Sequence, residues 1–131
     1  ASGKEAVKKY YDSLTSVLSK STPCLLDKSK LEFFGSQLTL ALQAQKKTDE
    51  LVSKTEDSYN QIKAISVPKD CIELQKKTLG IYLLWADLID RLGQSYREAN
   101  VQEFMSLGYK FQSLRGPLED WANDLAQNNP Q

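Results

Sequence analysis

Hydrophobic and small residues return every three or four positions along most of this chain, which is the spacing of an amphipathic α-helix. The longest such stretch runs from Ser36 to Val67 without a glycine or a proline. A helix over that stretch would be about 50 Å long, at a rise of about 1.5 Å per residue. The pattern therefore predicts long helices that pack side by side in a bundle.

Signals for helix starts and ends divide the chain into four helices. Residues 2–5 (SGKE) and 29–32 (SKLE) both fit a capping box, in which a serine caps the first amides and a glutamate reaches back. Pro23 ends the first helix, and Pro68 suits the first turn of the third. We therefore expect helices over residues 3–20, 29–65, 68–97 and 100–126.

The second predicted helix carries one seam, and the third carries two. The seam over residues 29–65 is unusually polar between Gln45 and Thr55, so this part either packs loosely or extends past its neighbours. The third helix has one stripe of Cys71, Thr78, Tyr82, Trp85, Ile89, Leu92 and Tyr96, and a second of Leu74, Ile81, Leu84 and Leu88. Two stripes indicate burial against more than one neighbour, so we expect this helix at the centre, with Trp85 buried.

The fourth predicted helix contains its own breaker. Its apolar stripe consists of Val101, Phe104, Gly108, Phe111, Leu118, Trp121 and Leu125. Gly116 and Pro117 interrupt this stripe, because proline lacks an amide donor and clashes with the preceding turn. Since short connections force antiparallel neighbours, we predict an all-α, antiparallel up-down-up-down four-helix bundle with a long second helix and a kinked or broken last helix, in a single domain over residues 1–131.

Composition and charge exclude several classes of function. Lysine plus arginine and aspartate plus glutamate number 17 each, and no basic face gathers along the chain, so we predict no nucleic-acid partner. Histidine is absent, which removes the commonest metal ligand and excludes a ferritin-like di-iron site. We therefore predict no metal, haem or other cofactor. Residues 79–89, the most apolar stretch, are about half the length of a membrane span, so no transmembrane segment is expected.

Two groups of side chains invite a functional interpretation, and in both cases the structural alternative is favoured. Six aromatic residues can be imagined around a ligand, although aromatics at helical spacing more often form a core: Tyr82, Trp85, Tyr96, Tyr109, Phe111 and Trp121. Glu119, Asp120 and Asp124 have the oxygen ligands of a cation site, but without a defined loop they are expected to face solvent. Because no nucleophile motif or phosphate-binding loop occurs, we assign no catalytic residue and expect no enzyme.

The two cysteines, Cys24 and Cys71, leave two alternatives open. In an oxidising compartment they would be expected to pair, which adds about 4 kcal/mol in the chain-entropy model. In the predicted bundle, however, they lie at opposite ends of a helix of about 50 Å, whereas a disulfide needs α-carbons within about 7 Å. A disulfide and an uninterrupted second helix are therefore nearly exclusive, and the uninterrupted helix is favoured.

These features favour a non-enzymatic helical-bundle protein that acts by contact with another protein. A surface rich in Ser, Thr, Asn and Gln suits an extracytoplasmic (periplasmic, cell-surface or secreted) protein, and the start at Ala1 suits a processed one. One form of this hypothesis is the soluble part of a bacterial lipoprotein. Two alternatives remain open: a cytoplasmic partner-binding or immunity-type helical protein, and a ligand-sensing bundle of a receptor, which requires flanking membrane helices.

Overall fold

The structure, a computed structural model, describes residues 3–21 and 45–129, and this part of the chain is all-α as predicted. Its elements in chain order are α1 (Gly3–Ser21), α5 (Gln45–Lys63), the 3-10 helix η1 (Lys69–Cys71), α6 (Ile72–Arg97), α7 (Val101–Ser113) and α8 (Arg115–Gln127). Although α6 has 26 residues, neither it nor any other described helix is apolar enough over a sufficient length to cross a bilayer.

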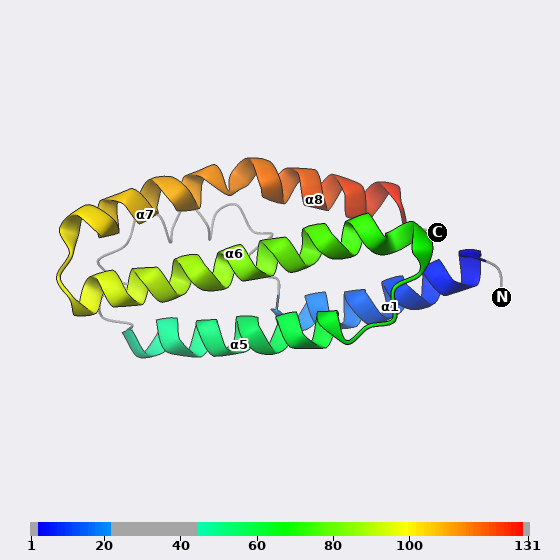
Figure 1. Cartoon of the computed structure of the whole chain (residues 1–131), viewed down its shortest axis with the longest axis horizontal. Coiled ribbons are helices and arrows are strands. Elements are labelled where there is room, and N and C mark those ends of the chain that lie inside the picture. The colour runs from blue at the N-terminus through cyan, green and yellow to red at the C-terminus, as the bar shows by residue number, and fades with distance from the viewer. Residues whose placement is uncertain (1–2, 22–44, 130–131) are drawn as a thin grey trace.

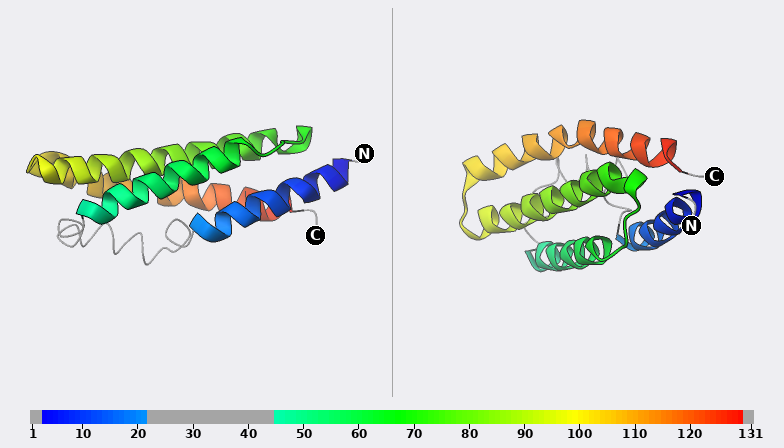
Figure 2. Two further views of the ribbon diagram at one scale, coloured as in Figure 1. Left: turned by 90° about the horizontal axis from the view of Figure 1, so that it is seen from below. Right: turned by 45° about the vertical axis from the view of Figure 1, so that its right-hand side comes forward.

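Among the described residues, α5 runs antiparallel to both α1 and α6, and the α7–α8 pair runs antiparallel to α6, which confirms the predicted up-down-up-down bundle (Figure 1). In Figure 1, α1 and α6 point one way, and α5 and the α7–α8 pair point the other way. The central helix is α6, because it lies between α5 and α7–α8 and contacts all three of these helices. The second set of views shows the same order, with α1 beside α5 (Figure 2).

The predicted helix bounds that fall on described residues hold closely, with displacements at Pro68 and, as described below, at Leu114. Helix α1 ends one residue beyond the predicted range. Helix α5 coincides with the C-terminal part of the predicted second helix, and residues 29–44 of that prediction lie outside the described residues. The third helix begins at Ile72 rather than at Pro68. Pro68 has an extended backbone (φ −69°, ψ 157°) and precedes η1, so one short 3-10 turn comes before the α-helix.

The last helix is broken, as predicted, and the break lies just before Gly116 and Pro117. Helix α7 ends at Ser113 and α8 begins at Arg115, with a bend of 30° between them. The ring of a helical proline clashes with the carbonyl four residues earlier, which here belongs to Ser113. The chain therefore bends at Leu114, and Pro117 lies in the first turn of α8, where a missing amide costs little.

The core lies where α6 faces its neighbours, and Trp85 is buried there as predicted, with 3% of its surface exposed. Three predicted core positions are wrong, because Leu84 is 41% exposed, Val101 is 66% exposed and Tyr109 is 69% exposed. The polar part of the second seam is not simply solvated, since Thr55 is buried and its hydroxyl donates to the Leu51 carbonyl at 2.6 Å. Because the Thr55 hydroxyl is hydrogen-bonded within its own helix, this polar residue can be buried in the contact between α5 and α6.

Candidate functional site

Buried hydrogen bonds join α1, α5 and α6 at one end of the bundle. The Tyr10 hydroxyl donates to Gln75 Oε1 at 2.7 Å, and Gln75 Nε2 donates to the Ile62 carbonyl at 2.9 Å. Burial, with smaller effects from Cys71 and Tyr11, raises the pKa of Tyr10, which therefore remains a neutral donor. Each of these polar groups has a partner within the network, so the network holds three helices in place.

A second set of contacts, buried or part-buried, holds α8 against α6 and α1. Trp121 Nε1 donates to Thr78 Oγ1 at 2.9 Å, and the Thr78 hydroxyl donates to the Leu74 carbonyl at 2.7 Å. The Tyr11 hydroxyl of α1 donates to the Leu125 carbonyl of α8 at 2.8 Å. Among the described residues, no buried side-chain nitrogen or oxygen lacks a hydrogen-bond partner. The interior therefore holds no polar group that waits for a substrate.

The aromatic residues form a core rather than a shared ligand pocket. Four of these aromatic residues are buried: Tyr82, Trp85, Phe111 and Trp121. The rings of Trp85 and Phe111 pack edge to face, with 5.6 Å between their centroids. Tyr109 lies apart from them, with 69% of its surface exposed. The prediction that the aromatic residues form a core is therefore correct for these four buried rings and wrong for Tyr109.

The acidic residues of α8 contribute to an ion-pair group rather than to a cation site. Lys77 of α6 pairs with Asp120 at 3.0 Å and with Asp124. Hydrogen bonds to Asp124 and Asp120 raise the pKa of Lys77, so it stays charged and neutralises part of this group. Within residues 3–21 and 45–129, no group of three Asp, Glu, Cys or His side chains is placed to hold a metal ion.

Cys71 is buried at the start of α6, beside Gly3 and Val7 of α1. Burial, with the neighbouring carboxylate of Asp70, raises the pKa of its thiol, so the thiol stays protonated and weakly nucleophilic at neutral pH. It has no disulfide partner among the described residues. Cys24 lies outside them, so the pairing of the two cysteines stays a prediction.

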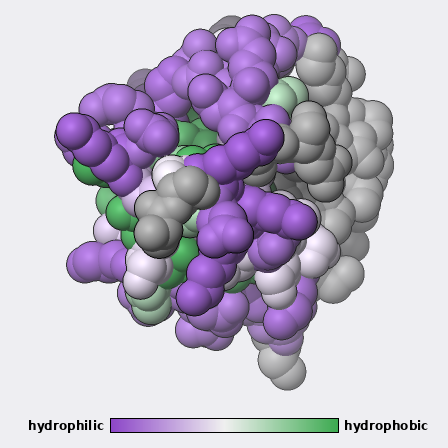
Figure 3. Space-filling model, turned by 90° about the vertical axis from the view of Figure 1, so that its right-hand side faces the viewer, coloured by the Kyte–Doolittle hydropathy of each residue, from purple (hydrophilic) through white to green (hydrophobic). Residues whose placement is uncertain are grey.

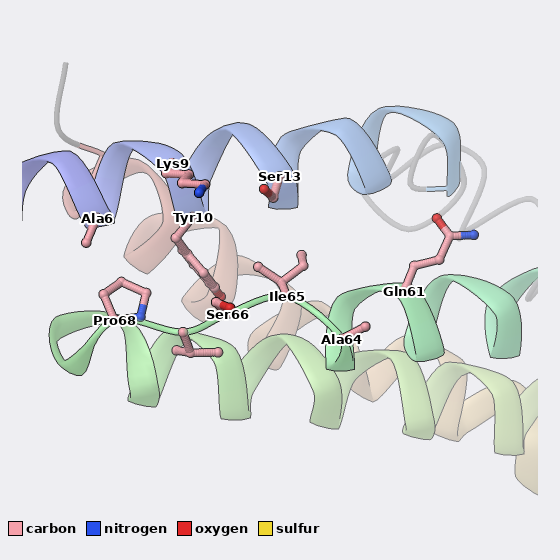
Figure 4. A pocket seen from close by; sticks show the side chains of 10 residues that line it. Ala6, Lys9, Tyr10, Ser13, Gln61, Ala64, Ile65, Ser66 and Pro68 are labelled. Atoms are coloured by element: carbon pink, nitrogen blue, oxygen red, sulfur yellow. The ribbon is translucent and has the colours of Figure 1, made fainter.

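A cavity of about 550 Å³ lies between α1 and the connection from α5 to α6 (Figure 4). Its apolar lining consists of Ala6, Tyr10, Ala64, Ile65, Val67 and Pro68. The lining side chains Lys9, Gln61 and Ser66 are exposed to solvent, and the Tyr10 hydroxyl is already bonded to Gln75. The volume suits a small molecule, but no buried polar group is directed into the cavity to orient one.

The solvent-exposed side of α7 carries no charged side chain. Its exposed residues, which we call the uncharged face of α7, are Val101, Gln102, Met105, Tyr109, Gln112 and Ser113. Val101, Met105 and Tyr109 are 66%, 59% and 69% exposed, and their spacing of four places them in one stripe. By contrast, each of the other described α-helices exposes both acidic and basic side chains. Figure 3 shows the end of the bundle near the start of α1, whose surface is mainly hydrophilic.

A tight turn fixes the start of α7 against the end of α6. Ala99 has a positive φ of 52°, its amide donates to the Tyr96 carbonyl, and the Asn100 amide donates to the Ser95 carbonyl. These bonds form a Schellman motif, which closes a helix with one left-handed residue. The Asn100 side chain then accepts a hydrogen bond from the Glu103 amide and caps α7. Asn100 therefore takes part both in the end of α6, through its amide, and in the start of α7, through its side chain.

Further contacts hold α7 rigidly below its uncharged face. Arg91 of α6 binds Glu103 through two nitrogens, at 3.1 and 2.5 Å, so this glutamate pairs across the turn instead of completing a capping box. On the opposite side of α7, Leu107 and Phe111 are buried. The uncharged face is thus presented by a helix that is fixed at its start and along its buried side.

A smaller and almost wholly apolar cavity of about 290 Å³ adjoins this face. It lies at the connection between α6 and α7 and is lined by Ser95, Tyr96, Ala99, Asn100, Val101 and Phe104. Val101 belongs to both the cavity and the uncharged face. An apolar side chain of a bound protein would find both a stripe and a recess here.

Comparison of the chain with protein-family models, with curated proteins and with solved structures found no match. The candidate site therefore rests on the chemistry of the described residues alone.

Sequence reasoning placed Val101 in the buried stripe and Tyr109 among the core aromatics, and so it missed the exposed stripe. One signal was available: Lys110 and Glu103 are the sole charged residues between Val101 and Ser113, and both lie outside the exposed side of the helix. A helix with apolar residues on two sides and charge on neither is hard to explain as an ordinary solvated helix.

Proposed function

We propose that this chain is a non-enzymatic helical-bundle protein that acts by contact with another protein chain through the uncharged face of α7. The observation that carries the proposal is the absence of charge across that face, combined with the exposed stripe of Val101, Met105 and Tyr109. The cores of protein–protein interfaces are depleted in charged residues and enriched in Tyr and Met. Exposure of the apolar side chains of this face to water is unfavourable, and because the face is uncharged, its burial by another protein carries a small desolvation penalty.

The surroundings of the face support a contact surface rather than a catalytic one. Every buried side-chain nitrogen and oxygen in the described residues has a hydrogen-bond partner, so this part of the interior presents no unpaired polar group to a substrate. The helix that presents the face is held by the Asn100 cap and by the Arg91–Glu103 ion pair. A rigid helix loses little conformational entropy when it binds, which favours recognition.

An extracytoplasmic location, for example as the soluble part of a bacterial lipoprotein, remains part of the proposal. It is supported by a polar surface rich in Ser, Thr, Asn and Gln. Fractionation of the producing cells, with an antibody against the purified protein, tests this location. Recovery in the cytoplasmic fraction would favour the alternative of a cytoplasmic partner-binding or immunity-type protein.

Photo-crosslinking in the producing cells tests the contact itself. A benzophenone amino acid replaces Tyr109, and in a matched control it replaces Leu83, which is 54% exposed on α6. We expect one defined covalent adduct from position 109, none from position 83, and loss of the adduct when Met105→Glu is added. Adducts of equal yield from both positions, or none from position 109, would show that the uncharged face of α7 is not a contact surface.

A further inference from the structure

We infer that the chain which covers the uncharged face of α7 is a second copy of the same protein, packed so that the two α7 helices cross about a two-fold axis. This inference rests on the proposed function and names its partner. In a two-fold contact the same surface is used by both copies, so residues near the axis meet their own counterparts. The surface must therefore be compatible with itself.

The charge pattern meets this condition at α7. Like charges that face one another across an interface oppose association, and the exposed side of α7 has no charges to oppose. The exposed sides of α1, α5, α6 and α8 all carry both signs of charge, so α7 is unlike every other described helix in this respect. The whole chain has zero formal net charge, so two copies do not repel one another at long range.

The polar residues of the face are also compatible with themselves. Gln102 and Gln112 each carry an amide that both donates and accepts, and the Ser113 hydroxyl does the same. Each can therefore bond to either a donor or an acceptor that it meets on a second copy, so that burial leaves no donor or acceptor unpaired. A face built from carboxylates or ammonium groups could not do this, because those groups only accept or only donate.

The stripe supplies the packing geometry. Val101, Met105 and Tyr109 form one ridge at intervals of four residues, and ridges of this kind interdigitate when two helices cross at about −50°. With Met105 at the axis, Val101 of each copy lies toward Tyr109 of the other copy, so a small side chain faces a large one. Methionine at the centre adapts its flexible side chain to its counterpart.

The area of the uncharged face limits the affinity of the contact between the two copies. The 13 residues of α7 span about 20 Å, and with a width of about 10 Å the face covers a few hundred Å² at most, against about 800 Å² per partner in a stable complex. The contact should therefore be weak and concentration-dependent, with a dissociation constant between about 1 µM and 1 mM.

Analytical ultracentrifugation of the full chain, between about 10 µM and 1 mM, tests the inference. We expect the weight-average mass to rise with concentration from 14.8 kDa toward twice that value. Met105→Glu should weaken association at least tenfold, because two carboxylates would meet at the axis. Leu83→Glu, which places the same charge at another exposed apolar position, should leave it unchanged. Circular dichroism establishes that both variants keep the helical content of the native protein.

Mixing provides the decisive measurement. Met105→Glu and Met105→Lys should each remain monomeric alone and associate with one another when mixed, because opposite charges then meet at the axis. A wild-type chain that is monomeric at about 1 mM, or association that survives Met105→Glu, would overturn the inference; so would two monomeric variants that fail to associate when mixed. If position 109 captures a different protein in cells while the wild-type chain stays monomeric, the self-association is wrong and the proposed function stands. If position 109 captures nothing, both are wrong.

Discussion

Replacement of Thr78 by valine is the sharpest test of how α6 and α8 are held together. The Thr78 side chain is fully buried and accepts a hydrogen bond from Trp121 Nε1 at 2.9 Å. Valine has nearly the same shape, so Thr78→Val removes this acceptor without opening a cavity. The indole N–H of Trp121, itself 1% exposed, is then left in the core without a partner.

The magnitude follows from two opposing terms. An unsatisfied buried donor costs about 1–3 kcal/mol, because its bond to water is lost and not replaced. The methyl group that replaces the hydroxyl adds apolar burial worth about 0.8 kcal/mol. The Leu74 carbonyl, which accepts from the Thr78 hydroxyl, keeps its backbone bond in the helix. The net loss in the free energy of unfolding should be about 1 kcal/mol, and at most about 2 kcal/mol.

Urea unfolding followed by circular dichroism at 222 nm measures this loss, and a double-mutant cycle assigns it. When Trp121→Phe removes the indole N–H, a further Thr78→Val change should cost little, giving a coupling energy of about 1 kcal/mol. Thr55→Val is the matched control, because the buried Thr55 hydroxyl also donates to its own helix, whereas the Trp121 indole N–H bonds to Thr78 and not to Thr55. A Thr78→Val variant as stable as the native protein, or a coupling energy near zero, would refute this account of the α6–α8 contact.

Three further outcomes are expected. Ala99→Gly should raise the free energy of unfolding by about 1 kcal/mol, since Ala99 adopts a left-handed conformation that costs an L-residue about 1–2 kcal/mol; a urea midpoint that does not rise would contradict this. Burial raises the pKa of Tyr11 to about 12, above the value of about 10 in an unfolded chain. The unfolded state therefore releases its proton first and stability falls from about pH 10 upward, so Tyr11→Phe should lose less thermal stability than the native protein between about pH 8 and pH 11. Thiol titration of the denatured protein should find two free thiols, Cys24 and Cys71, because Cys71 packs beside the first turns of α1 while α1 continues as a helix to Ser21; a monomer with no free thiol would show that the two are bonded.

The helices were predictable because their causes are local. The capping box at residues 2–5 placed the start of α1, and hydrophobic spacing placed the end of α6, at the residues observed. A proline also causes each of the two displaced boundaries, at Pro68 and at Leu114. The exact position of each boundary depends on the turn around that proline. Pro68 precedes a 3-10 turn, and Pro117 displaces the break toward Ser113, four residues earlier.

The candidate site was not predictable in the same way, because it depends on which side of α7 meets α6. Val101 and Leu107 are both apolar, yet Val101 is exposed and Leu107 is buried. Hydrophobic spacing alone fits either arrangement, since the helix has apolar residues on two sides. The choice is made by contacts distant in sequence, such as the Arg91–Glu103 ion pair and the packing of Phe111 against Trp85.

The turn at Ala99 and Asn100 has a consequence for how this protein tolerates insertion and deletion. An α-helix turns by about 100° per residue, so a single residue added to the turn or removed from it would rotate α7 by that angle about its own axis. The stripe of Val101, Met105 and Tyr109 would move toward the bundle, and part of the buried side would move toward water. The length of this turn must therefore agree with the packing of α7 against α6, such as the contact of Phe111 with Trp85, for the uncharged face to point outward.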